Sequence, residues 1–549
     1  MRGKGSAWRF WPSAPDGAPP VVFGVALVVA LVTALTEPYA VTGVAGLLTG
    51  ITVAAGPVAV AVLSRPARWR LVRPLPIAAG VCTLLLLAMG TVRDAGWLYA
   101  LCLLTALGLA SYGLVAGRRW SSVFLAGFAA PIGLIRGIPW LFRGLRLSRT
   151  AGGPGRQRPA TATPDGSSPG EPASGVAAET SPPGGPAPAS GVAAGTPPPG
   201  GQALARGAAA ARLLAVVVGT GLLLLIFGAL FASADPAFSS MLSRMIPELS
   251  PELIGRSFVG LVVAGFTLGA CVIARTPPRI DRLGTTRPRR VRRIEWLVPM
   301  VPLVALFAAF VAVQITVLFG GHEHVLRTAG LTYADYARRG FGELVMVTLL
   351  TLAVLAAVAR WAPRATAPDR ALLRLVPGAL CLLILVIVAS ALYRMHLYQE
   401  AYGFTRLRLV VDAFELWLGV VFVMILVAGA RLRGSWLPRA TVGTGVAALL
   451  VLGAMNPDAF IAERNAARYA DSKKIDVGYL RELSADAVPA LDRLPEPQRS
   501  CALSVIEVEL REPEEWYTYN PARERARELL KRHPVRRDVT CPERYTYMD

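Results

Sequence analysis

The sequence predicts an all-α protein, in which a polytopic bundle of about eleven transmembrane helices is followed by a small helical C-terminal domain. Hydrophobic residues make up 54% of the 549 residues, and several apolar runs exceed the roughly 18 residues that cross a bilayer. In hydrocarbon, only helices and closed barrels satisfy their own backbone hydrogen bonds. The runs are continuously apolar rather than alternating, which excludes a barrel.

Eleven apolar runs are assigned as spans. The first follows a basic start that contains Trp8, Phe10 and Trp11. No small-residue cleavage site follows it cleanly, so we expect a retained helix with an interfacial aromatic anchor. The predicted spans are residues 20–36, 39–63, 75–92, 96–117, 211–232, 257–274, 295–319, 342–360, 372–392, 409–430 and 437–454.

The basic residues are distributed unequally between the two sides of this arrangement. Loops on the side of the N-terminus carry 32 of the 57 Lys and Arg residues, loops on the opposite side carry 9, and the C-terminal tail carries 16. The positive-inside rule therefore makes the N-terminus cytoplasmic, and the odd number of spans puts the tail outside. Abundant Arg, Ala, Gly and Pro are typical of GC-rich bacterial genomes, so we expect a multi-pass protein of the bacterial cytoplasmic membrane. The net charge is +21, but the basic residues that produce it flank apolar helices. We therefore predict no nucleic-acid partner.

One apolar segment would reverse this topology if it crossed the membrane. Residues 120–142 are apolar but contain Pro131, Arg136 and Pro139. If they formed a span, the loop at 275–293, which carries eight arginines, would face outside. We therefore interpret the segment as interfacial or re-entrant.

A low-complexity linker divides the membrane-embedded part. Residues 147–209 consist mainly of Gly, Pro, Ala, Ser and Thr, and PASGVAAETSPPGG at 172–185 recurs as PASGVAAGTPPPGG at 188–201. Such a composition cannot bury enough apolar surface to offset the entropy of ordering, so we predict disorder. The expected domains are a four-span unit at 1–146, the cytoplasmic linker at 147–209, a seven-span unit at 210–455 and a soluble tail at 456–549.

The tail differs from the rest in charge and periodicity. It carries 16 basic and 18 acidic residues, with apolar residues near helical spacing at 477–494, where Ser484 is a candidate cap, and a further helix expected at 521–532. Cys501 and Cys541 are the only cysteines of the tail; an oxidising compartment would permit a disulfide, and two free thiols are the alternative. The other four cysteines lie in apolar runs, where we expect packing roles.

Two polar, tyrosine-rich loops, at 320–345 and 393–417, are assigned to the outer side. His396 and Glu400 are four residues apart, which places them on one face of a helix. Asp412 and Glu415 enter an apolar run, where a carboxylate needs a cavity or a basic partner. The predicted binding cluster is Arg394, His396, Glu400, Arg406, Arg408, Asp412, Glu415, Tyr333 and Tyr336.

A metal site is a weaker hypothesis for the same loops. Imidazole and carboxylate are usual zinc ligands, which makes His322, His324, His396 and Glu400 candidates, but HEH is not the HExxH motif and solvated loop residues are the alternative. The sequence contains no phosphate-binding GxxxxGK[ST] loop, no HExxH and no CxxC pair. We therefore predict no enzyme activity, no catalytic residue and no cofactor.

Three stretches carry a resemblance to a known family: LFASADPAF (230–238), GLTYADYARRGF (330–341) and LYQEAYGFTRLRLVVDAF (397–414). Over residues 210–455 the chain resembles bacterial membrane proteins of domain of unknown function 4173, and DVGYLRELSADAVPAL at 476–491 is similar to their tails. The resemblance implies a membrane location and a helical fold. It implies no reaction.

Three functional hypotheses follow. A non-enzymatic envelope scaffold or sensor ranks first, because a soluble domain accompanies the spans and catalytic motifs are absent. A secondary transporter ranks second and an outer-leaflet enzyme third; the two membrane units show no matching loop pattern, although many transporters are built from repeats. The lipid bilayer is the expected partner, with anionic headgroups as candidates at the Arg-rich loop 275–293.

Overall fold

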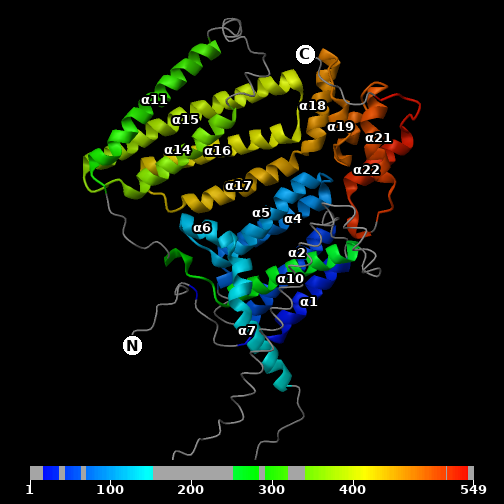
Figure 1. Ribbon diagram of the computed structural model, residues 1–549, viewed down its shortest axis with the longest axis horizontal. Helices are drawn as coiled ribbons and strands as arrows, with labels where there is room; N and C mark the ends of the chain where they lie inside the picture. Colours follow the sequence, from blue (N-terminus) through cyan, green and yellow to red (C-terminus); the bar gives the residue numbers. More distant parts are fainter. Residues whose placement is uncertain are drawn as a thin grey trace, which may run out of the picture. The chain divides into compact units, whose positions relative to one another are not determined.

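The computed structural model describes residues 11, 17–35, 44–63, 70–151, 251–282, 291–319, 341–514 and 516–541, and these contain helices but no strand (Figure 1). Nine helices of the described residues are long and apolar enough to cross a membrane, or ten if one bent pair is a single span. The nine are α2 (Val44–Leu63), α4 (Pro74–Val92), α5 (Gly96–Val115), α10 (Pro251–Arg275), α11 (Arg293–Phe319), α14 (Phe341–Trp361), α15 (Ala367–Tyr402), α16 (Arg406–Arg431) and α17 (Leu437–Ala454).

The predicted polytopic helical fold is confirmed, and nine of the eleven predicted spans coincide with these helices. The first predicted span is α1 (Pro20–Leu35), whose apolar stretch Pro20–Thr33 is shorter than a typical span. The predicted span at 211–232 lies outside the described residues, as does nearly all of the linker at 147–209. The chain divides into two compact units, Met1–Leu141 with Ser250–Asp549, and Phe142–Leu249. The contacts described below belong to the first.

The segment at 120–142 is not one straight helix. It forms α6 (Trp120–Gly127) and α7 (Ala129–Ala151), which meet at an angle of 70°. Ser111 of α5 stabilises the break, since its hydroxyl donates to the carbonyl oxygen of Ala126 at 2.5 Å and accepts from the amide of Ala130 at 3.1 Å. One side chain thus satisfies backbone groups on both sides of the interruption, where the helical ladder leaves them unpaired.

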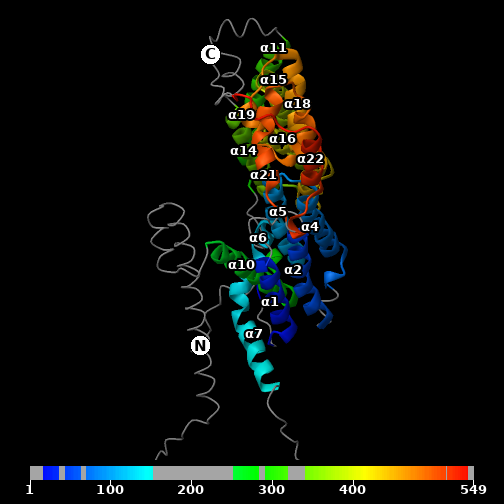
Figure 2. The same ribbon diagram turned by 90° about the vertical axis from the view of Figure 1, so that its right-hand side faces the viewer.

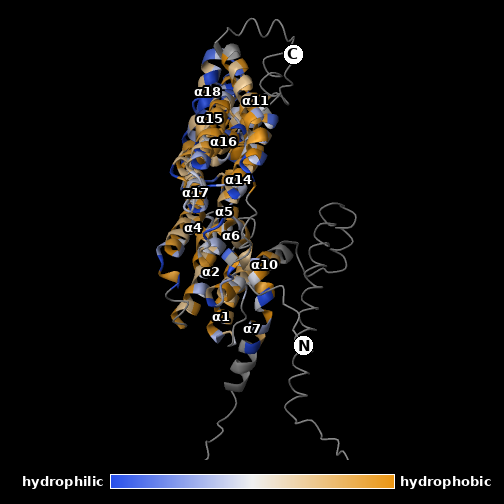
Figure 3. Cartoon of the chain, turned by 90° about the vertical axis from the view of Figure 1, so that its left-hand side faces the viewer, coloured by the Kyte–Doolittle hydropathy of each residue, from blue (hydrophilic) through white to orange (hydrophobic). Residues whose placement is uncertain are grey.

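The helices α11, α14, α15 and α16 share a core of buried apolar side chains, among them Met300, Leu380, Ile384 and Phe422. Side chains on their other faces are exposed, as expected for helices surrounded by lipid tails; Leu306 is 65% and Leu375 is 69% exposed. Figure 3 shows the resulting hydrophobic colour along most of these helices and hydrophilic colour on α18.

The tail folds into short helices: α18 (Pro457–Ser472), α19 (Val477–Leu480), the 3-10 turn η3 (Ala485–Ala487), α20 (Val488–Leu491), α21 (Gln498–Arg511), the 3-10 turn η4 (Trp516–Thr518) and α22 (Pro521–Arg532) (Figure 2). The helix expected at 521–532 matches α22. The periodic stretch 477–494 is broken into three pieces, and Ser484 begins η3 without a capping hydrogen bond from its side chain.

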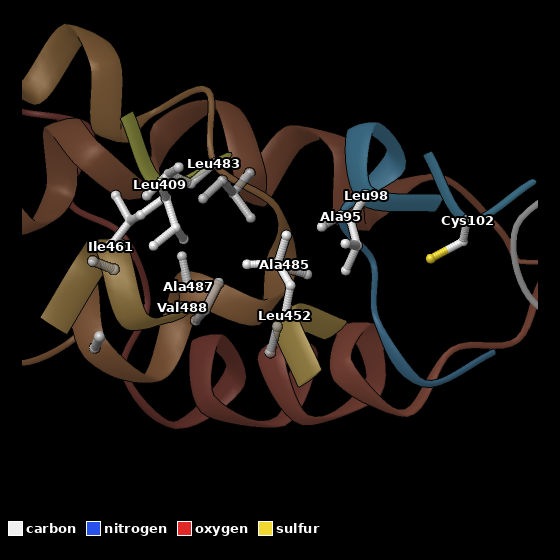
Figure 4. Packing of buried hydrophobic residues seen from close by; sticks show 14 of the residues in the cluster. Ala95, Leu98, Cys102, Leu409, Leu452, Ile461, Leu483, Ala485, Ala487 and Val488 are labelled. Carbon is white, nitrogen blue, oxygen red and sulfur yellow. The ribbon is translucent and has the colours of Figure 1, made fainter. Parts of the chain in front are cut away.

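The tail does not have a core separate from the membrane helices. Ile461 and Leu491 of the tail belong to one buried cluster with Leu98 of α5 and Leu409 of α16. Figure 4 shows Leu409 and Ile461 in this cluster together with Leu98. A disulfide joins Cys501 of α21 to Cys541, with 5.5 Å between their Cα atoms. The tail is therefore packed on the ends of the spans rather than tethered to them.

Candidate functional site

The structure brings polar groups together where the tail meets the ends of α4, α5, α15, α16 and α17. We call this region the tail junction and define it by Asp94, Arg406, Asp458, Asn465 and Asp486. These residues are far apart in the sequence and reach the junction from the α4–α5 connection, from the start of α16 and from the tail.

The turn between α15 and α16 is held by the tail through its backbone. Asn465 of α18 accepts from the amide of Phe404 and donates to its carbonyl oxygen, both at 2.9 Å. Gly403 adopts φ +82°, a conformation that favours glycine, and a Cβ there would lie 2.5 Å from Oδ1 of Asn465. A side chain at Gly403 would therefore separate the turn from α18.

Asp458 is the most heavily bonded carboxylate of the junction, and its side chain is fully buried. It accepts two hydrogen bonds from Arg406, Nε to Oδ1 at 3.0 Å and Nη2 to Oδ2 at 2.5 Å. Trp97 Nε1 donates to Oδ1 at 3.0 Å, and the amide of Ser484 donates to Oδ2 at 2.9 Å. Burial opposes ionisation, but the hydrogen bonds and the charge of Arg406 hold the pKa of Asp458 below its usual value. The four donors account for the buried charge.

Asp94 and Asp486 form a reciprocal pair across the junction. The amide of Asp94 donates to Oδ2 of Asp486 at 2.7 Å, and the amide of Ala485 donates to Oδ2 of Asp94 at 3.2 Å. Burial raises the pKa of Asp94 to about 6, against the opposing charge of Arg523, whose Nη1 lies 3.8 Å from Oδ1 of Asp94. The α4–α5 turn and η3 are thus bonded backbone to side chain in both directions.

Arg93 connects the same turn to the end of α17. Its Nε donates to the carbonyl oxygen of Gly453 at 2.9 Å, and Nη2 donates to that of Ala454 at 2.8 Å. These carbonyls belong to the last turn of α17, where a cation also interacts favourably with the helix dipole.

The predicted binding cluster is divided among several places. Arg406 pairs with Asp458 and not with the carboxylates of its own helix. Arg394 donates to the side-chain oxygen of Gln314 on α11, and Gln399 donates to Asp412 at 2.5 Å. His396 and Glu400 form an exposed pair at 3.2 Å. Arg408 lies over the ring of Tyr398 at 4.1 Å and donates to the carbonyl oxygen of Gly403.

Glu415 differs from the other members of the cluster. It is only 4% exposed within α16, and its Oε2 has no hydrogen-bond partner among the described residues. Burying a carboxyl oxygen without a hydrogen-bond donor costs free energy. Protonation of Glu415, or binding of a ligand to it, would reduce this cost.

The candidate metal ligands are not assembled in the described part of the chain. No group of three or more His, Cys, Asp and Glu side chains lies close enough there to hold a metal ion. His322, His324, Tyr333 and Tyr336 lie outside the described residues. His396 and Glu400 provide two adjacent ligand types on one exposed helix face.

Sequence reasoning missed the acidic members of the junction. Asp94 follows α4 by two residues and Asp458 follows α17 by four, so each is a carboxylate just beyond the end of an apolar run. That position was a usable signal. Nothing local to either residue indicates its partner, since Arg406 and Asp458 are 52 positions apart in the chain.

A family model described as Domain of unknown function (DUF4153) matches residues 80–163 and 198–494. The chain belongs to this family. The resemblance to domain of unknown function 4173 was wrong in the family that it named, because the matching model is that of DUF4153, whose match also includes most of α4, all of α5 and the first part of the tail, up to residue 494. The expected membrane fold is unaffected by this correction. Neither the curated proteins nor the solved structures contain a match to this chain.

Proposed function

We propose that this DUF4153 protein is a non-enzymatic scaffold or sensor of the bacterial envelope, in which the tail presents a binding surface held on the membrane helices. The tail junction supports this proposal. Its buried ion pair and reciprocal hydrogen bonds hold the tail in one orientation, as a receptor surface requires and a spacer does not.

The surface that we assign to a partner is on α21. Val505 and Val508 are three residues apart, so they share one face of the helix, and they are 39% and 61% exposed. The opposite side of α21 contributes Leu503 and Ile506 to the buried core. An exposed apolar pair on a domain that is otherwise rich in charge is suited to a protein partner.

We also propose that the tail is outside the cell and the N-terminus in the cytoplasm. The junction is at one end of α15 and α16, and Arg364, Arg374, Arg431 and Arg433 are at the other, as the positive-inside rule requires for a cytoplasmic end. A further arginine group on that side surrounds Arg70. Burial and the charges of neighbouring arginines lower the pKa of Arg70, and we propose that this group contacts anionic headgroups.

The orientation is tested with two exposed positions. A single cysteine replacing Asp471 on α18 should react with a membrane-impermeant maleimide in intact cells. A cysteine replacing Arg433 should react only after permeabilisation. The reverse pattern would overturn the proposed orientation.

The scaffold proposal is tested by cross-linking in cells. A photoreactive amino acid at Val508 should give a discrete adduct with another protein, whereas the same group at Asp471 should not. A protein that lacks residues 456–549 should still insert into the membrane, but it should not restore the phenotype of a strain from which the whole gene has been deleted. Full complementation by the truncated protein would refute the proposal.

A secondary transporter is the second candidate, and Glu415 is the observation that favours it. Ionisable residues within spans are rare and mark ion or proton pathways. Asp412 is three residues away on the same helix and is bonded to Gln399. If the protein is a transporter, Glu415→Gln should abolish proton or substrate flux in proteoliposomes; in a scaffold, the same variant should keep the Val508 adduct.

A further inference from the structure

A cavity lies at the end of the bundle opposite to the tail junction. It is formed by α14, α15, α16 and the turn that precedes α17, and its volume is about 310 Å³. Its walls are apolar: Leu355 and Val358 come from α14, and Cys381, Ile425 and Leu426 come from α15 and α16. This volume is at the lower end of the range of ligand pockets.

Small residues leave this space open. Gly429 of α16 lines the cavity, and a Cβ at this position would meet nothing within 4 Å. At Gly378 of α15, a Cβ would have only Leu426 as a neighbour, at 3.7 Å. Leucine at either position would therefore extend into the cavity without first displacing backbone atoms.

Within the described part of the chain, the charged residues that line the cavity are two arginines. Arg364 follows α14 and donates to the carbonyl oxygen of Ala359 at 2.7 Å, which holds its guanidinium near the end of that helix. Arg374 lies on the second turn of α15, is exposed, and has no hydrogen-bond or ion-pair partner within the described part of the chain. The nearby carboxylate of Asp369 is already paired with Arg293, at 2.7 Å. The cavity therefore combines an apolar interior with uncompensated positive charge.

We propose that this cavity is a binding site for an anionic phospholipid. Part of an acyl chain would occupy the apolar interior, and the phosphate would interact with Arg364 and Arg374. Basic pockets between membrane helices on the cytoplasmic side are suited to such headgroups, and Arg is suited to phosphate oxygens. Trp361 and Leu375 beside the arginines are 49% and 69% exposed, as expected for positions near the headgroups and the lipid tails.

This inference extends the proposed affinity of the cytoplasmic arginines for anionic headgroups to one defined site. It does not depend on the role of the tail. A soluble phosphate compound is the alternative occupant, but the apolar walls would contribute nothing to its binding.

The test is native mass spectrometry of the full-length protein in detergent, titrated with phosphatidylglycerol, phosphatidylcholine or inorganic phosphate. Phosphatidylglycerol should be retained and the other two should not. Arg364→Gln and Arg374→Gln should each weaken retention about fivefold, the effect of removing one basic residue from an anionic surface. Arg433→Gln, which removes an exposed arginine that does not line the cavity, should have no such effect.

A second variant tests the apolar interior. Gly429→Leu keeps both arginines and should also reduce retention of phosphatidylglycerol. Equal retention of phosphatidylglycerol and phosphatidylcholine, or unchanged retention in both arginine variants, would overturn the proposal. Retention of inorganic phosphate at the level of phosphatidylglycerol would identify a phosphate site instead. None of these outcomes alters the cross-linking predicted at Val508.

Discussion

The ion pair between Arg406 and Asp458 should contribute most to holding the tail on the membrane helices. In Arg406→Ala, the carboxylate of Asp458, which is fully buried in the native protein, keeps only the donors from Trp97 and Ser484. Removing one partner of a buried ion pair costs about 3–5 kcal/mol. The equilibrium for opening the junction should therefore shift by about 150- to 4,000-fold.

The assay is hydrogen exchange of the tail amides in detergent, or limited proteolysis within 457–541. Both report the open population of the junction when opening and closing are fast. Arg406→Ala with Asp458→Ala should cost less than the sum of the two single variants, because the double variant leaves no unpaired buried charge.

The control is Glu400→Gln, which breaks the exposed pair with His396. Both side chains of that pair are 58% exposed, so the expected change is at most about 1 kcal/mol. If Arg406→Ala opened the junction no more than Glu400→Gln does, the buried pair would not hold the tail, and the reasoning from burial would be refuted.

Three further predictions concern the tail and its junction. The pKa of Asp94 is raised to about 6, so the protonated side chain contributes its full stability below pH 4, and this contribution is lost as the pH rises through 6. The effect amounts to about 3 kcal/mol at most. Asp94→Asn should remove this pH dependence, measured as protease resistance between pH 4 and 8. The Cys501–Cys541 disulfide closes a sequence separation of 40, so replacing both cysteines by alanine should destabilise the tail by about 4 kcal/mol in thermal unfolding, and an unchanged midpoint would show that the tail does not need the bond. Gly403→Ala should cost about 1–3 kcal/mol through its positive φ and its contact with Asn465, and Asn465→Ala should relieve part of that cost; full additivity would argue against the contact.

The spans were predictable because the bilayer sets a length that local sequence must meet. The same holds for α22, where residues 521–532 carry a strong helical pattern and Asn520 accepts from the amide of Ala522 as an N-cap. The segment at 120–142 was predicted to be interfacial or re-entrant, and the prolines only partly indicated its break, since Pro131 lies three residues after Phe128 at the break while Pro139 lies inside α7. What the proline positions did not indicate is Ser111, which stabilises the break from another helix.

The tail junction was not predictable from the same information. Arg406 was predicted to lie in one cluster with Asp412 and Glu415, the carboxylates of its own helix. Its actual partner, Asp458, follows a span that lies between them in the sequence. Pairings across helix ends depend on how the spans pack, and periodicity within one helix carries no information about packing between helices. The cavity at Arg374 depends on the same packing.

The tail and the α4–α5 turn form one junction. A disulfide between Asp94→Cys and Ala485→Cys tests this most directly, since Oδ2 of Asp94 lies 3.2 Å from the amide nitrogen of Ala485. The four cysteines outside the tail are replaced by alanine, and a protease site is introduced between residues 152 and 209.

After oxidation in membranes and cleavage at that site, the two fragments should migrate together until a reductant is added. Asp94→Cys with Asp471→Cys, in the same background, should leave the fragments separate. If the 94–485 pair failed to join the fragments, or joined them no better than the 94–471 pair, the tail would not be docked on the membrane helices as described.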